Sequence, residues 1–357
     1  MNTAWQQITG RLARQGVFAP GSAEQALHEQ RLTRFFEREF RRHQEMPQSL
    51  SELGISTAQG PLMERTGELM KSHYDERPEF FATFLDRRYC AYSMAWYGNT
   101  ANEVRASDSN LEQAQRDKFA LIASRAGIEG TERILNIGCG FGSLETFLLE
   151  EYPDIQVTGI TPSRVQIDYL SRRMQNPADL MSGGRFRLVA GGFDPQSLDQ
   201  IGRAGFDLVI SIGVVEHVRN MKLLLECIAQ TLVPGGRTFH HYITSRSPIP
   251  RFLDPLKSRI GLYFPGGRVW PHGELLRHTG LFEPLNSWFV NGMNYWRTLH
   301  EWHVRYWEGL PALYDSVFDE KEIAHWNEYF SLCKAVFAPM EGNFYGNSHY
   351  LLQLRQA

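Results

Sequence analysis

The 357-residue chain has only four cysteines, and they lie far apart, at Cys90, Cys139, Cys227 and Cys333. No two of them have C-x-x-C spacing, and none stands at the distance from histidine that zinc sites use. A zinc site and a disulfide scaffold are therefore disfavoured, and no metal is expected. The pattern instead predicts a reducing, cytoplasmic setting.

The sequence also lacks long apolar runs and an excess of charge of either sign. No uninterrupted apolar stretch approaches the roughly 20 residues of a membrane-spanning helix, and the first residues lack the apolar segment of a signal peptide. The 37 Lys and Arg against 40 Asp and Glu leave a formal charge of −3. We therefore expect no integral membrane segment and no nucleic-acid partner.

Tryptophan and glycine are unevenly distributed along the chain. Six of the eight tryptophans fall in the last quarter, at Trp270, Trp288, Trp296, Trp302, Trp307 and Trp326. Glycine gathers in the middle third instead. The 42% hydrophobic content is enough for one large domain or two smaller ones with a packed core. The glycine-rich and aromatic-rich regions are predicted to do different jobs.

Residues 1–70 are predicted to form a helical extension. Ser22 and Gln25 have capping-box spacing, and a buried helical stripe is predicted at Leu32, Phe35, Phe36 and Phe40. The opposite face carries as many glutamates as arginines, which favours a solvated face over a membrane-surface helix. These residues are Arg31, Arg34, Arg38, Arg41 and Arg42, with Glu24, Glu29, Glu37, Glu39 and Glu45.

From about residue 110 the chain alternates predicted helices and strands. The first helix has capping-box spacing at Ser109 and Glu112 and is closed by Gly127. Strands are predicted at 133–138, 155–160, 186–191, 206–213 and 237–244, and helices at 143–152, 163–174 and 221–232. Alternation of this length predicts an α/β fold with a doubly wound, largely parallel sheet.

After about residue 245 the alternation stops. An aromatic-rich stretch runs to 309, followed by a predicted helix around 319–337 and a final strand at 349–354. Four regions are therefore predicted. They are a helical N-terminal extension at 1–70, a helical substrate-side segment at 71–128, a Rossmann-like core at 129–245, and an aromatic substrate cap with terminal strands at 246–357.

A glycine loop, Gly138-Cys139-Gly140-Phe141-Gly142, follows the first strand and opens a helix. In this context glycines let the backbone approach a ligand at the carboxyl ends of the strands. A dinucleotide site would need another glycine where Ser143 stands and an acidic residue about 20 positions later. The next strand ends at Thr161 without one, so an NAD site is disfavoured.

The loop and an ordered series of segments resemble class I S-adenosylmethionine-dependent methyltransferases, more narrowly the cyclopropane-fatty-acid synthase and mycolic-acid methyltransferase family. The matching segments include His73-Tyr74-Asp75, Cys90-Ala91-Tyr92, Leu135-Asn136-Ile137-Gly138, Thr158-Gly159-Ile160-Thr161, Glu216-His217, Pro234-Gly235-Gly236, Phe264-Pro265-Gly266-Gly267 and Arg297-Thr298-Leu299. The resemblance implies a Rossmann-like, seven-stranded sheet that binds S-adenosylmethionine.

The same resemblance implies where the cofactor is held. The methionine end would lie on Gly138, Gly140 and Gly142, and the ribose on Thr161 and Gln166. Adenine would lie near Phe193 and Asp194, where the spacing differs from the family pattern by about one residue. Ile212 is placed with this set. Tyr89 stands where the family has a serine that holds the cofactor carboxylate, so its contribution departs from the pattern.

In cyclopropane-forming members of the family, a bound bicarbonate takes up a proton. By resemblance its ligands here would be Cys90, Glu216, His241, Ile243 through its backbone, and Tyr329. Tyrosine and histidine can donate hydrogen bonds to an anion, and Glu216 could orient the histidine or the anion. Each residue alone is also compatible with core packing, whereas the five in family order favour a catalytic set.

Further departures leave the acceptor open. Asn294 replaces a family histidine, and residues 1–70 have no clear counterpart. The related coclaurine-type N-methyltransferases share the Glu-His positions. We therefore expect methyl or methylene transfer to carbon or nitrogen of a small-molecule or lipid acceptor, in bacterial secondary metabolism. Three further functions stay open: cyclopropane formation on unsaturated acyl chains, intramolecular cyclisation of the cofactor that releases methylthioadenosine, and a non-catalytic binding scaffold. A homodimer also remains open.

Overall fold

The computed structural model describes residues 3–44, 54–63, 78–247, 250–254, 256–314, 316 and 318–356. The predictions made for His73-Tyr74-Asp75, for Glu45 and for the boundary between residues 70 and 71 lie outside these residues. Among the described residues, no helix combines the length and apolar character needed to cross a bilayer.

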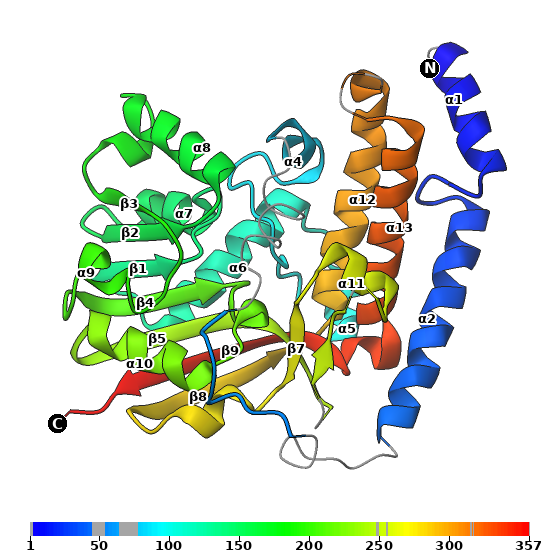
Figure 1. Cartoon of the computed structure of the whole chain (residues 1–357). Helices are drawn as coiled ribbons and strands as arrows, with labels where there is room; N and C mark the ends of the chain where they lie inside the picture. Colours follow the sequence, from blue (N-terminus) through cyan, green and yellow to red (C-terminus); the bar gives the residue numbers. More distant parts are fainter. Residues whose placement is uncertain are drawn as a thin grey trace.

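The centre of the molecule is the predicted doubly wound sheet (Figure 1). Five parallel strands lie side by side, in the order β3 (Phe186–Ala190), β2 (Gln156–Thr161), β1 (Arg133–Ile137), β4 (Phe206–Ile212) and β5 (Leu232–Ser245). The strand order reverses between β1 and β4, so a ligand-binding crevice is expected at their carboxyl ends.

Antiparallel strands complete the sheet. β9 (Tyr345–Leu354) pairs with β5, and β8 (Phe282–Val290) pairs with β9. With the parallel strands they make the seven-stranded sheet that the family resemblance implies. Two short strands extend it, because β7 (Arg268–Pro271) joins β5 beyond the last residue that pairs with β4, and β6 (Arg251–Phe252) pairs with β7.

Successive side chains of a strand point to opposite faces of the sheet, and both faces are apolar. Helices therefore cover both faces and form one apolar cluster on each. Leu135 and Ile137 of β1 pack in one cluster with α10 (Met221–Thr231) and α9 (Leu198–Ile201). Ile134 packs in the other cluster with α6 (Leu111–Ala126), α7 (Ser143–Glu151) and α8 (Arg164–Gln175). The strands β1, β2 and β4 are buried over nearly their whole length, which is typical of parallel sheets.

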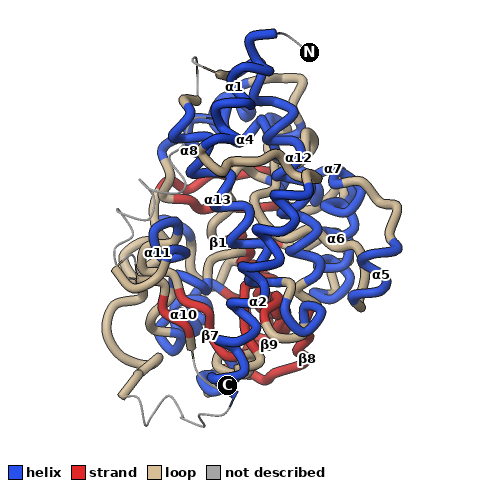
Figure 2. Tube along the Cα trace, turned by 90° about the vertical axis from the view of Figure 1, so that its right-hand side faces the viewer, coloured by secondary structure: helices blue, strands red, loops and turns tan. Residues whose placement is uncertain are grey.

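A third cluster joins the N-terminal and C-terminal helices. Its elements are α1 (Thr3–Arg14), α2 (Ala23–Gln44), α4 (Pro78–Phe84), α5 (Ala101–Ala106), α11 (Arg259–Tyr263), α12 (Met293–Leu313) and α13 (Glu320–Phe337). Figure 2 shows α2 running along α13, which in turn packs against α12. The N-terminal extension therefore packs against the predicted C-terminal cap. The division into four regions stays a prediction.

The helix boundaries confirm some of the predicted caps and correct another. Ser22 caps α2, because its Oγ accepts the Gln25 N–H at 3.2 Å, and Gly127 ends α6 in the left-handed conformation with φ 67°. The predicted cap at Ser109 is wrong by one residue: the Asn110 side chain accepts the N–H of the third helical residue. Glu112 instead pairs with an arginine of α12.

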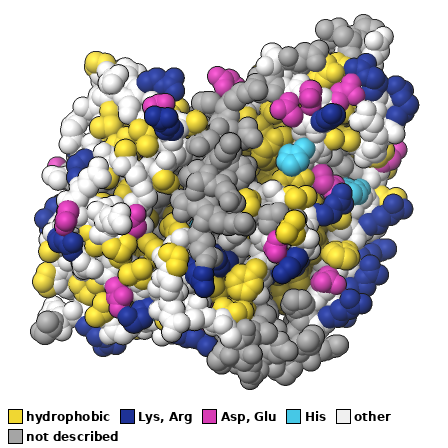
Figure 3. Space-filling view, in the orientation of Figure 1, with side chains coloured by type: hydrophobic (Ala, Val, Ile, Leu, Met, Phe, Trp, Pro, Cys, Tyr) yellow, Lys and Arg dark blue, Asp and Glu magenta, His cyan; other side chains and the backbone are white. Residues whose placement is uncertain are grey.

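The outer face of α2 differs from the prediction in two ways. Phe36 and Phe40 are buried, but Phe35 is 48% exposed, so the predicted stripe is narrower. Glu29 does not balance the arginines on the solvated face, because its carboxylate pairs with the buried Lys334. Figure 3 shows Lys and Arg side chains along the right-hand edge, where α2 runs. The exposed arginines are Arg31, Arg34, Arg38, Arg41 and Arg42.

Candidate functional site

A cavity of about 260 Å³ lies at the carboxyl ends of β1, β2, β4 and β5, the position expected from the strand order. The helical layer closes its other side with aromatic residues that include Phe81, Tyr92 and Tyr295. Most of the predicted site residues line this cavity. They are Cys90, Gly138, Gly140, Thr161, Gln166, Phe193, Ile212, Glu216, His241, Ile243 and Tyr329.

The glycine loop turns sharply at the cavity wall. Gly138, Gly140 and Gly142 all have positive φ, at 75°, 59° and 78°, which glycine adopts without strain. A Cβ at Gly140 would meet nothing within 4 Å, so the loop leaves space there for a ligand. A Cβ at Gly142 would instead meet Met181 and Leu170. Gly142 lies outside the cavity lining and permits close packing of α7 against its neighbours.

The residues predicted to hold the ribose and adenine separate in the structure. Thr161 donates its hydroxyl to Gln166 Oε1 at 2.6 Å, so the two residues form one polar pair at the cavity wall. Phe193 also lines the cavity, but Asp194 does not. The Asp194 carboxylate accepts the N–H groups of Gln196 and Ser197 at 2.8 and 2.9 Å. The placement of Asp194 at the adenine is therefore not supported.

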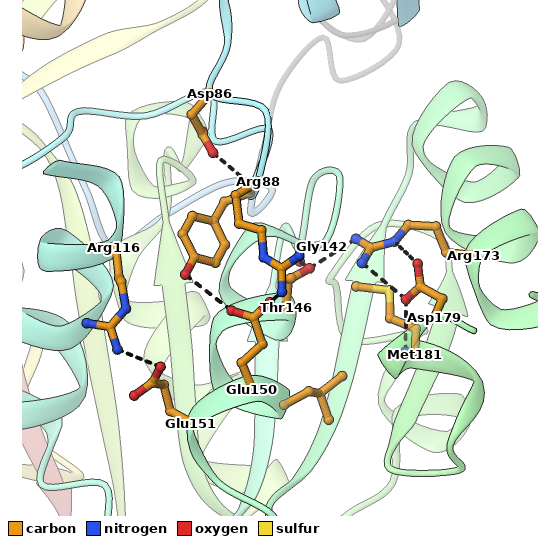
Figure 4. Close-up of polar contacts among 12 residues, drawn as sticks. Asp86, Arg88, Arg116, Gly142, Thr146, Glu150, Glu151, Arg173, Asp179 and Met181 are labelled. Atoms are coloured by element: carbon orange, nitrogen blue, oxygen red, sulfur yellow. Dashed lines mark hydrogen bonds and ion pairs between the residues drawn. The ribbon is translucent and has the colours of Figure 1, made fainter. Parts of the chain in front are cut away.

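Tyr89 also lies outside the cavity lining. Its ring packs on Phe119 and Phe147, and its hydroxyl donates to Glu150 of α7 at 3.3 Å. Figure 4 shows Arg88 directed to Glu150 and Arg116 directed to Glu151 on the same helix. The segment before Cys90 is thus fastened to α7, and the Tyr89 side chain packs there rather than in the cavity lining.

A buried carboxylate holds Cys90 at the cavity wall. The Asp86 carboxylate accepts the N–H groups of Tyr89 and Ala91 at 2.6 and 2.8 Å, and Cys90 between them has φ 50°. Positive φ at a non-glycine residue costs of order 1–3 kcal/mol and is typical of functional sites. Burial raises the pKa of the Cys90 thiol, so at neutral pH the group is a weak hydrogen-bond donor.

Glu216 lies in a short turn, Val215–His217, that follows β4. Its Oε1 accepts the Ile243 N–H at 2.8 Å, whereas its buried Oε2 has no partner among the described residues. Burial raises the pKa of Glu216 to about 7, although the Ile243 N–H opposes this shift. The same bond engages the Ile243 N–H, and the predicted contact of the Ile243 backbone with an anion stays a prediction.

The neighbouring His217 is a cavity residue that the predicted catalytic set left out. Burial, with a smaller contribution from Arg268, lowers the pKa of His217 to about 4. The ring is therefore neutral at physiological pH. Its place directly after Glu216 was the available sequence signal, since the Glu-His pair was part of the family pattern.

His241 lies on β5 and contacts two residues of β9. Its Nδ1 is 2.7 Å from His349 Nε2, and its Nε2 is 2.8 Å from the Asn347 amide. Burial, then the nearby cations Lys118 and Arg125, holds the pKa of His241 well below its usual value. Sequence reasoning missed Asn347 and His349. Their alternation in the last strand was the only signal, and the strand register determines their partner.

Tyr329 completes the predicted set from the helical side. Its hydroxyl lies 3.1 Å from that of Tyr92, and burial holds the pKa of Tyr329 well above its usual value. Cys90, Glu216, His241 and Tyr329 thus reach one cavity from four parts of the chain. Among the described residues, no group of three or more His, Cys, Asp or Glu is arranged to hold a metal ion.

The sheet topology and the glycine loop after β1 define the fold of class I S-adenosylmethionine-dependent methyltransferases. Solved structures share it. Coclaurine N-methyltransferase bound to N-methylheliamine and SAH is 20% identical with a TM-score of 0.70, covering 97% of this chain and 93% of that chain. The cyclopropane synthase MmaA2 from Mycobacterium tuberculosis is 24% identical with a TM-score of 0.64, covering 82% and 100%.

Residues 63–345 match the family model described as mycolic acid cyclopropane synthetase, and the chain belongs to this family. A Pseudomonas putida protein described as "Probable fatty acid methyltransferase" is 30% identical over 280 residues, covering 76% of this chain and 66% of that protein. Cyclopropane-fatty-acyl-phospholipid synthase of Escherichia coli K12 is 26% identical over 272 residues, covering 75% and 63%. The matches span 56% to 66% of the first curated relatives.

Proposed function

We propose that this protein is an S-adenosylmethionine-dependent methyltransferase that acts on carbon or nitrogen of a small-molecule or lipid acceptor. One observation carries the proposal: the apolar cavity contains both the open glycine loop and a carboxyl oxygen of Glu216 that has no partner in the part of the chain that the structure describes. The family membership supports the same reaction. The relatives' printed names include both lipid and alkaloid methyltransferases, so both acceptor classes are retained.

The residues present fit the cofactor. Gly140 leaves open space beside the loop, and Thr161 with Gln166 offers a polar pair at the neighbouring strand end. Gly138, Gly140, Thr161, Gln166, Phe193 and Ile212 would hold it. When bound, S-adenosylmethionine supplies an electrophilic methyl group. The aromatic wall from the helical layer would exclude water and stabilise nearby positive charge.

Glu216 is proposed to accept the proton that the acceptor loses as it gains the methyl group, with S-adenosylhomocysteine as the co-product. Its pKa of about 7 suits this task, because a base works best with a pKa near the operating pH. His217 lines the same wall, but its pKa of about 4 makes it a weaker base than Glu216. A base that must act on a nearby nitrogen or carbon is best placed within a cavity that excludes water.

A second candidate is cyclopropane formation with a bound bicarbonate. It is favoured by the convergence of Cys90, His241 and Tyr329 around Glu216 in one cavity. The neutral thiol and phenol could donate hydrogen bonds to an anion. Ile243 would contribute less than expected, because its N–H already serves Glu216. Intramolecular cyclisation of the cofactor and a non-catalytic binding scaffold are two further hypotheses.

Product analysis separates these functions. The purified protein is incubated with methyl-labelled S-adenosylmethionine in three arms: alone, with vesicles of unsaturated phospholipid, and with a panel of small amines. We expect S-adenosylhomocysteine to form only with an acceptor and the label to enter that acceptor. Methylthioadenosine formed without an acceptor would contradict methyl transfer. Cofactor binding without turnover in any arm would favour the scaffold hypothesis.

A further inference from the structure

A chain of three polar side chains leads from β9 and α6 to the cavity. Arg125 of α6 lies with Nη1 2.8 Å from His349 Nδ1, and its guanidinium stacks 4.8 Å from the Trp288 ring centre. His349 Nε2 lies 2.7 Å from His241 Nδ1. His349 and His241 are buried and directly opposite each other in the pairing of β9 with β5.

Arg125 determines which ring nitrogen carries the proton in both His349 and His241. A guanidinium has only donors, so His349 Nδ1 must accept from Arg125. A neutral His349 then carries its proton on Nε2, from which it donates to His241 Nδ1. His241 Nδ1 is thereby an acceptor, and the neutral His241 ring must carry its proton on Nε2. Both rings are neutral because burial and the cations Lys118 and Arg125 disfavour a further positive charge.

The Asn347 amide must adapt to this arrangement. Its Nδ2 lies 2.8 Å from His241 Nε2, while its Oδ1 has no partner among the described residues. Two donors would then face each other. The oxygen and nitrogen of an amide occupy equivalent positions, and the partners decide which is which. Exchanging them gives His241 an acceptor, so Asn347 presents its oxygen to the histidine.

We propose that His349 is a positioning residue that, held by Arg125, keeps the proton of His241 on Nε2. His241 then donates from Nε2 to the Asn347 amide and is not the base of the reaction. Proton acceptance falls to Glu216 or His217. The catalytic consequence rests on the proposed function, whereas the protonation state of His241 does not depend on it.

Nitrogen-15 NMR of the histidine-labelled protein tests the protonation state directly, because protonated and unprotonated ring nitrogens have separate shifts. The His241 signal is assigned by its loss in His241→Gln. We expect the wild-type protein to show a proton on His241 Nε2. A proton on Nδ1 would overturn the proposal whether or not a methyl acceptor is found.

Two variants of similar shape then test the role of His349. In His349→Gln the amide accepts from Arg125 and still donates to His241, so the proton should stay on Nε2 and kcat should remain within about threefold. In His349→Glu the carboxylate pairs with Arg125 and accepts from His241, which should move the proton to Nδ1 and lower kcat on the order of 10- to 100-fold at similar KM.

The two readouts separate the outcomes. A His349→Glu protein with the reversed proton and unchanged kcat would overturn the catalytic consequence. If His349→Glu does not fold, the wild-type spectrum carries the test, and a proton on His241 Nδ1 would contradict the role of His349. Absence of methyl transfer with every acceptor would count against the proposed function, while the wild-type spectrum would still decide the state of His241.

Discussion

Glu216 is the residue at which burial and chemistry are most closely linked. Its carboxyl is buried, one oxygen is held by Ile243, and the other has no partner among the described residues. We expect Glu216→Gln to retain the Ile243 bond but to lower kcat/KM about 10²- to 10³-fold, because the amide cannot accept a proton. Methyl transfer measured with each variant, alongside cofactor binding that stays near wild type, checks this.

The pH dependence follows from the same carboxyl. With the pKa of Glu216 at about 7, the base is protonated at lower pH, so kcat/KM should rise through pH 7 and then level off. The contribution of Glu216 to the free energy of unfolding should instead decrease as the pH rises. Between the ordinary carboxyl value and 7 the native state holds a proton that the unfolded state has lost, so the free energy of unfolding falls as pH rises.

Lys118→Met is the control for this profile. Burial lowers the pKa of Lys118 to about 7. Titration of Lys118 would therefore produce a similar rise in kcat/KM with pH. We expect the rise in kcat/KM to persist in Lys118→Met and to disappear in Glu216→Gln. A profile that keeps its rise in Glu216→Gln would contradict the assignment of the base.

The glycine loop offers a matched pair of substitutions. Gly138→Ala and Gly140→Ala both place a side chain at positive φ, which costs roughly 1–2 kcal/mol. At Gly138 the new Cβ would also lie 2.5 Å from Val214 Cγ2, whereas at Gly140 it enters open space. We therefore expect Gly138→Ala to be the more destabilising in urea unfolding. Gly140→Ala should stay folded but lose at least tenfold in cofactor affinity by calorimetry. If Gly140→Ala binds the cofactor as tightly as the wild-type protein does, the cofactor does not occupy that space.

At the residue scale, the site residues that the sequence predicted well are those whose role depends on local conformation. The glycines lie in a strand-to-helix turn, so their role follows from neighbouring residues. Tyr89 could not be placed in this way, because a tertiary contact with Glu150 directs its side chain. Asp194 was misplaced although its partners are local, because its carboxylate accepts the N–H groups of Gln196 and Ser197 in its own turn. His349 was missed because its partner lies 108 positions away and is chosen by strand register.

At the scale of elements, α2 is fastened to α13 by one buried ion pair. Lys334 has a side chain 1% exposed and contacts the Glu29 carboxylate and His303 Nδ1. Glu29→Gln leaves the ammonium without its counter-ion, which should lower the free energy of unfolding by about 3 kcal/mol. Denaturant unfolding of purified variants measures the loss.

The double variant Glu29→Gln/Lys334→Met supplies the control for the pair. Replacing both charges removes the uncompensated ammonium, so most of the lost stability should return. If Glu29→Gln and Lys334→Met destabilise additively, the two residues are not coupled, and α2 is held by its other contacts with α13, such as the Gln25–Ser331 hydrogen bond and the His28–Glu328 ion pair.

Elements were predictable where their pattern was simple. The strands and helices of the core have clear periodicity and appear close to the predicted ranges, but α12 was seen only as an aromatic stretch. Its Trp296, Trp302 and Trp307 have near-helical spacing, although only Trp302 is fully buried. The last strand begins at Tyr345 rather than 349 because pairing with β5 extends it back to Tyr345, and pairing with β8 reaches Asn347.

At the scale of the whole molecule, α2 packs against the chain segment that forms part of the cavity wall. Phe40 of α2 stacks on Phe344 at 4.2 Å and packs edge-on against Tyr345 at 4.7 Å between ring centres. Tyr345 lines the cavity. α2 therefore packs directly against a residue of the cavity wall, although sequence reasoning treated residues 1–70 as a separate region without a family counterpart.

This arrangement predicts that Phe40→Ala affects both stability and catalysis. Losing a buried phenylalanine should cost about 3–5 kcal/mol, and relaxation of Tyr345 into the space should raise KM for the acceptor. Phe35→Ala on the same helix is the control, because that side chain is 48% exposed and its loss should cost no more than about 0.5 kcal/mol. Urea unfolding and steady-state kinetics of both variants compare the two positions. If they behave alike, α2 contributes nothing specific to the cavity wall.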